Sequence, residues 1–137
     1  MDGAHFSCNE QSAYSFRLMT ENIGAGLVVA FSTAGSPQEA RRIAGALVAE
    51  QLAACVNIID NIHSIFRWQG KIQSSSESLL LIKTRANLIP AIELRLRELH
   101  SYDIPELVAI PIGPGSQPYL DWLFASTQDT TARTKFV

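Results

Sequence analysis

The spacing of apolar positions changes several times between residues 27 and 126, and each change predicts a new element. The continuous apolar run 27–31 is typical of a central strand buried on both faces. A helix start follows, with Ser36 as N-cap, Pro37 at the first helical position and Glu39 closing a capping box. Apolar residues then recur at the spacing of one helix face, at Ala40, Ile43, Ala44, Leu47 and Val48.

A long hairpin is the next predicted feature. Strand-like alternation covers residues 55–68, Gly70 supplies the positive φ of a tight turn, and residues 72–83 return as a strand. At ~3.3 Å per residue the run 58–68 and its return each span roughly 35 Å, whereas a domain of this length has a radius of gyration near ~14 Å. The tip must therefore project from its own core. Because an isolated ribbon carrying Phe66 and Trp68 is marginal in water, we expect the hairpin to pack against another subunit.

The remaining pattern completes one α+β topology. Asn87 is predicted to cap a second helix, which carries Glu93 and Arg97 as an i,i+4 pair. Residues 106–112 predict a fourth strand, and Ser116 is predicted to cap a short terminal helix. The order βαββαβ plus a terminal helix is that of a ferredoxin-like sandwich. Right-handed crossovers place the first and third strands in the middle of an antiparallel sheet, with both helices on one face.

Length and composition favour one domain without a membrane or nucleic-acid role. Residues 1–24 are interpreted as a flexible leader, 25–127 as the folded domain and 128–137 as a tail. The net charge is −2 and Lys and Arg form no cluster, so the chain lacks the basic face that nucleic acid requires. No run of 18 apolar residues and no secretory signal pattern occur, so a cytoplasmic protein is predicted. The low charged share, 18%, favours an oligomer.

His100 is the clearest metal candidate among the residues with ligand chemistry. Neutral imidazole is a good ligand for Cu(II), Zn(II) and Ni(II), and Asp103 and Glu106 are close in sequence as oxygen donors. The competing interpretation is a histidine at a helix C-terminus, where the macrodipole favours it. The two cysteines, Cys8 and Cys55, form no CxxC motif, and Cys55 is interpreted as a small buried hydrophobe.

Five segments, in order and at matching spacing, resemble the CutA family of divalent-cation tolerance proteins. They are 50–57 (EQLAACVN), 64–72 (SIFRWQGKI), 81–84 (LIKT), 102–106 (YDIPE) and 119–122 (YLDW). The resemblance covers residues 27 to about 126 without large gaps. It implies a ferredoxin-like fold, a tight homotrimer, and a role in tolerance to copper and other divalent metals.

The resemblance also implies a ligand set, which this chain matches at one position. In well-known bacterial members, the reported metal ligands are a cysteine ending the first strand and two successive histidines before the Tyr-x-x-Pro-Glu motif. By position, the cysteine falls at Ser32 and the histidine pair at Leu99 and His100. The metal ligand predicted here is therefore His100 alone, with Cu²⁺ as the implied ion.

A second candidate site would form only between subunits. If copies pack through their hairpins, an interface cleft would gather five residues, namely Arg67, Trp68, Lys83, Tyr102 and Glu106. A Glu106 carboxylate buried there needs a cation such as Lys83 or Arg67. Such a network either binds a ligand or only locks the oligomer together.

The leading prediction is a homotrimer that binds divalent metal ions and works by binding, not by turnover. One alternative is a small-molecule sensor like the PII signalling proteins, with an effector in the clefts between subunits, on fold-level analogy. Others are a rigid scaffold without a ligand and an enzyme that uses the interface carboxylate. Catalysis has little support, because no Ser/His/Asp or Cys/His arrangement has a recognisable context and Gly113-Pro114-Gly115 lacks the lysine of a phosphate loop.

Overall fold

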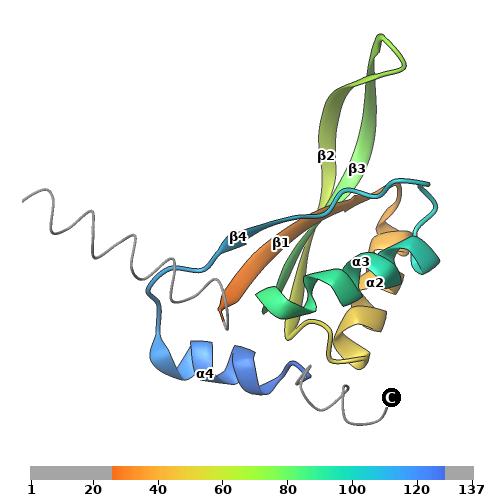
Figure 1. Ribbon diagram of the computed structural model, residues 1–137. Coiled ribbons are helices and arrows are strands. Elements are labelled where there is room, and N and C mark those ends of the chain that lie inside the picture. The colour runs from red at the N-terminus through yellow and green to blue at the C-terminus, as the bar shows by residue number, and fades with distance from the viewer. Residues whose placement is uncertain (1–25, 129–137) are drawn as a thin grey trace, which may run out of the picture.

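The fold is built on a four-stranded antiparallel sheet with the order β2-β3-β1-β4 (Figure 1). The structure is a computed structural model that describes residues 26–128. Its strands are β1 (Leu27–Ala34), β2 (Cys55–Trp68), β3 (Lys71–Arg85) and β4 (Val108–Pro111). The helices are α2 (Pro37–Ala49), the single 3₁₀ turn η1 (Ala86–Leu88), α3 (Ile89–Leu99) and α4 (Gln117–Ala125). The ferredoxin-like order and the central places of β1 and β3 are confirmed. The predicted leader and nearly all of the predicted tail lie outside the described residues.

Helix α2 begins where the sequence predicts. Ser36 is the N-cap, its Oγ accepts a hydrogen bond from the Glu39 N–H at 3.1 Å, and Pro37 opens the helix. The capping box is only half right, because the Glu39 carboxylate bonds to Ser101 instead of the cap. Val48 is predicted to lie on the buried face of the helix, but the residue is 42% exposed.

Both helices α2 and α3 pack on one face of the sheet (Figure 1). Strand β1 accordingly alternates between buried and half-buried residues, so the prediction that it is buried on both faces is wrong for the single chain. The buried set faces the helices and consists of Val28, Ala30, Ser32 and Ala34. The reason is that α2 and α3 cover one side only.

The opposite side, which we call the open face, is rich in large apolar residues. Directly paired residues of an antiparallel sheet point to the same side, and the register joins Phe31 to Val108 and Leu81, and Val29 to Ile110. Val108 is 59% exposed and Ile110 is 54% exposed. Helix α4 packs against one end of β1 and β3 and leaves the rest of this face uncovered.

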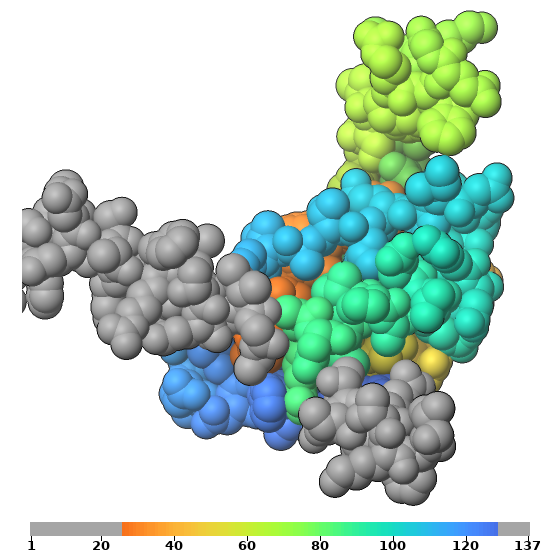
Figure 2. Space-filling model, in the orientation of Figure 1, coloured from red at the N-terminus to blue at the C-terminus, as the bar shows by residue number. Residues whose placement is uncertain are grey.

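The β2–β3 hairpin projects from the domain, as its length predicts (Figure 2). Its strands pair from Cys55 opposite Lys83 to Trp68 opposite Lys71, and a bulge interrupts the register between Ile59 and Ile62. Gly70 has φ 76°, which confirms the predicted turn.

The starts of α3 and β4 differ from the predicted ones, and the predicted cap of α4 lacks its side-chain bond. Asn87 is not the cap of α3: it lies inside η1, and α3 starts after Leu88, which makes no side-chain capping bond. Strand β4 starts at Val108 rather than at Glu106, because pairing with β1 begins only at Val108. The preceding residues 103–107 lie along α3, and Leu107 packs against the core. Ser116 is the N-cap of α4, but its side chain makes no capping bond.

Candidate functional site

The ring of His100 is wholly buried at the C-cap of α3. Its Nδ1 lies 3.0 Å from the Tyr102 N, whose N–H donates to it, and its Nε2 lies 2.6 Å from the Thr33 O. Because Nδ1 accepts a hydrogen bond, we assign the ring proton to Nε2, which donates to the Thr33 carbonyl. Both ring nitrogens are therefore engaged inside the chain.

The described part of the chain does not assemble a metal site around this ring. Within residues 26–128, no group of three His, Cys, Asp or Glu side chains is arranged to hold an ion. Asp103, offered as an oxygen partner, lies on the wall of a surface cavity. That His100 binds a metal stays a prediction, and binding through Nδ1 would require the Tyr102 N–H bond to break.

The two positions that depart from the family pattern face the core or pack on it. Ser32 is 1% exposed, and its Oγ has no hydrogen-bond partner in the described part of the chain. Leu99 is partly buried and packs on the hydrophobic core. Neither side chain can replace the missing thiolate or imidazole nitrogen, so these two positions add no strong ligand beside His100.

Glu39 fixes the start of α2 to the end of α3. Its Oε1 accepts a hydrogen bond from the Ser101 N–H at 2.7 Å, and its Oε2 accepts one from the Ser101 Oγ at 3.0 Å. Burial by itself would raise the pKa of Glu39, but these two hydrogen bonds, aided by the positive charge of Arg42, hold the pKa below its usual value. The carboxylate is therefore the form that the fold stabilises.

Tyr102 ties the segment after α3 to the root of the hairpin. Its hydroxyl donates to the Glu77 Oε2 at 2.8 Å and lies close above Gly35, where an added Cβ would approach the Tyr102 oxygen to 3.3 Å. Burial and the bonded Glu77 carboxylate raise the pKa of Tyr102 to about 12. Partial burial and the negative charge of Glu77 also raise the pKa of Glu106. Tyr102, Glu77 and Glu106 thus form one acidic group at the hairpin root.

The single chain does not bring the five predicted cleft residues together. Trp68 lies at the hairpin tip and Lys83 pairs with Cys55 at its other end. At ~3.3 Å per residue these two side chains are roughly 40 Å apart. Lys83 instead donates from Nζ to the Tyr119 Oη at 3.3 Å. Cys55 is half-buried, so its predicted full burial is wrong for the isolated chain.

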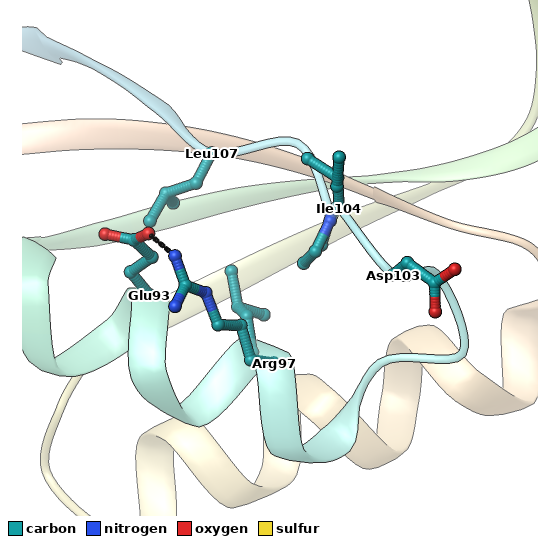
Figure 3. A pocket seen from close by; sticks show the side chains of 7 residues that line it. Glu93, Arg97, Asp103, Ile104 and Leu107 are labelled. Atoms are coloured by element: carbon teal, nitrogen blue, oxygen red, sulfur yellow. Dashed lines mark hydrogen bonds and ion pairs between the residues drawn. The ribbon is translucent and has the colours of Figure 1, made fainter.

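A shallow cavity of about 350 Å³ lies between α3 and the segment 103–107 (Figure 3). The Glu93–Arg97 ion pair, at 2.6 Å, forms part of its wall, as expected for an i,i+4 pair. Leu96, Ile104 and Leu107 supply apolar lining. Of the residues predicted for a site, only Asp103 lines this cavity. Periodicity could not reveal it, since it depends on how the segment after α3 folds back over the helix.

Sequence reasoning also missed Glu77 and Glu39 as parts of the site. The sequence did offer a sign of Glu77, because it is the only charged residue between Lys71 and Lys83 in the predicted strand. Glu39 was recognised only as a capping residue. Its tertiary partner Ser101 lies 62 positions away, and no local pattern reports such a contact.

The fold and the family comparisons agree. The model of the CutA1 divalent ion tolerance protein family matches residues 28–126. The CutA protein of Thermus thermophilus is 48% identical over 99 residues, which are 72% of this chain and 96% of that protein. The chloroplastic CutA 1 of rice is 39% identical over 119 residues, which are 87% of this chain and 67% of that protein. The solved structure of Thermus thermophilus CutA1 superimposes with a TM-score of 0.73 at 47% identity and covers 74% of this chain and 99% of its own.

These observations define a ferredoxin-like α+β domain with a projecting hairpin and a terminal helix. The chain belongs to the CutA1 divalent ion tolerance family. Among the described residues, no helix is long and apolar enough to cross a bilayer.

Proposed function

We propose that the protein acts in divalent-cation tolerance as a homotrimer that binds divalent metal ions of the copper class in the cytoplasm. The observation that carries this proposal is the family match over nearly the whole described domain. Two curated relatives, from rice and Arabidopsis thaliana, are named as chloroplastic, and the chain spans 67% and 56% of their lengths. Binding rather than turnover is the proposed mode of action.

The open face supports the assembly. Soluble monomers rarely leave contiguous apolar patches larger than a few hundred Å² uncovered, and here Val108 and Ile110 continue the half-buried row of β1 and β3. The hairpin gives a second reason, since Ile65 is 76% exposed and Ile72 is 72% exposed near its tip. A second copy packed on these surfaces would remove them from water.

Metal binding is proposed at His100, with ligands completed by a rearranged segment 100–106 or by a second copy. Such a completion is needed because His100 is the one residue that matches the family's reported ligands, and the described residues hold no cluster of donors around it. Both of its ring nitrogens also already make hydrogen bonds. An ion that takes Nδ1 must break its bond with the Tyr102 N–H. Copper binding is therefore expected to change the structure around Tyr102.

Calorimetric titration with Cu²⁺ tests this site. We expect His100→Ala to weaken the affinity at least tenfold, because it removes the proposed nitrogen ligand. His63→Ala, which removes an exposed imidazole of β2, is the matched control and should keep wild-type affinity. Since the His100 ring is buried, circular dichroism must first show that the variant is folded. Unchanged copper affinity in folded His100→Ala would remove His100 as a ligand.

The second candidate function is that of a small-molecule sensor, with the effector bound in one chain rather than in the clefts between subunits expected from the PII analogy. The observation that favours it is the cavity beside α3, whose volume of about 350 Å³ is in the range of small-ligand sites. Its wall offers a cation in Arg97 and acids in Glu93 and Asp103. Absence of copper binding, together with thermal stabilisation of the wild-type protein by a nucleotide or small organic acid, would favour this function over the first.

A further inference from the structure

Within the described residues, the acidic group at the hairpin root has no cationic partner. Glu77 is 8% exposed, and neither Glu77 nor Glu106 takes part in an ion pair in the described part of the chain. The Tyr102 hydroxyl gives Glu77 one neutral hydrogen bond. A carboxylate that is held out of water, as that of Glu77 is, costs free energy unless a positive charge joins it.

The group lies on the open face, next to exposed apolar residues. Glu77 shares the alternation of Leu79 and Leu81 along β3, which places it on that side. Glu106 lies two residues before Val108, which is 59% exposed. The acids therefore border an uncovered apolar surface.

The hairpin tip carries the complementary set of groups. Arg67 pairs directly with Ile72 across the ribbon and alternates with Ile65, so these three side chains share one side, which we call the tip face. Both isoleucines are more than 70% exposed, and Arg67 makes no ion pair within residues 26–128. Figure 2 shows this part of the hairpin standing clear of the rest of the described domain, which therefore leaves the tip face uncovered.

We propose that the tip face of one copy docks on the hairpin-root end of the open face of a second copy, where Arg67 forms an ion pair with Glu106 beside Glu77. The isoleucines on either side of Arg67 would then cover the apolar surface around Val108. Arginine suits this position because its planar guanidinium can join two carboxylates at once. Lys83, the other predicted cation, is engaged with Tyr119. This inference rests on the proposed assembly and names its contact.

Charge reversal tests the contact through the concentration at which the assembly dissociates, measured by sedimentation velocity on the full chain. Arg67→Glu and Glu106→Arg should each raise that concentration at least tenfold, since close charge pairs at interfaces couple strongly. The double variant, which restores opposite charges, should recover most of the loss. Lys71→Glu, on the other side of the same tip, is the matched control and should have a much smaller effect.

The outcomes separate this contact from the assembly itself. A monomeric wild-type protein at micromolar concentration would overturn both the proposed homotrimer and this docking mode. An assembled wild type in which Arg67→Glu equals Lys71→Glu, with no recovery in the double variant, would overturn the docking mode alone. Circular dichroism must show that each variant is folded.

Discussion

Leu96→Ala is expected to destabilise the domain by about 3–5 kcal/mol, the range found when a fully buried leucine is truncated in a core that relaxes little. Leu96 is 0% exposed and belongs to the core cluster formed by α2, α3 and the buried side of the sheet. Its side chain also forms part of the cavity wall beside α3. The truncation therefore removes core contacts and enlarges the cavity beside α3. Urea unfolding followed by circular dichroism measures the loss.

Leu94→Ala is the matched control for this prediction. Leu94 lies on the same helix and is 61% exposed, so the same chemical change should shift stability by less than about 1 kcal/mol. Both variants must be measured at one protein concentration, because assembly would couple unfolding to dissociation. Equal losses in the two variants would show that α3 does not pack on the core through the face assigned to it.

Arg85→Ala is expected to cost about 2–4 kcal/mol and to loosen α4, because it breaks a buried, charged hydrogen-bond network. Arg85 is 8% exposed and donates to the Thr127 Oγ1 and to the backbone oxygens of Phe124 and Thr127, at 2.6, 2.6 and 3.0 Å. Its guanidinium also lies 3.6 Å from the centre of the Phe124 ring. A cation at a helix C-terminus is further favoured by the helix dipole.

Hydrogen exchange of the α4 amides provides the local measurement for Arg85. Arg85→Ala should raise exchange in α4 far more than in α2, since the lost bonds hold only the end of α4. Lys83→Ala, two residues earlier on the same side of β3, removes one bond to Tyr119 and should change α4 much less. Unchanged protection of α4 in Arg85→Ala would show that the arginine does not anchor the helix.

The elements that the sequence predicted well are those set by local chemistry. Ser36 and Pro37 place the start of α2, Gly70 makes the hairpin turn, and Glu93 pairs with Arg97. Each of these interactions joins residues within four positions. Asn87 is the exception, because the chain at the end of β3 first makes a 3₁₀ turn, so the helix starts after Leu88.

The candidate site was harder to predict because its contacts join distant segments. The family pattern pointed to His100, but the bonds of its ring to Thr33 and Tyr102 follow from how α3 meets the end of β1. The same holds for Glu77, whose partner Tyr102 lies 25 positions away. The residues proposed for the cleft, such as Arg67 and Lys83, lie at opposite ends of the hairpin. They could come together only between two copies, so a single chain does not show the cleft.

Native mass spectrometry of the full chain, with and without added Cu²⁺, tests the central claim most directly. The chain has a mass of 15.0 kDa. The proposed function predicts a species of three times that mass at micromolar concentration, which gains whole copper ions when the salt is added. A protein that remains at 15.0 kDa would contradict the proposed assembly, and one that gains no copper would contradict the proposed binding.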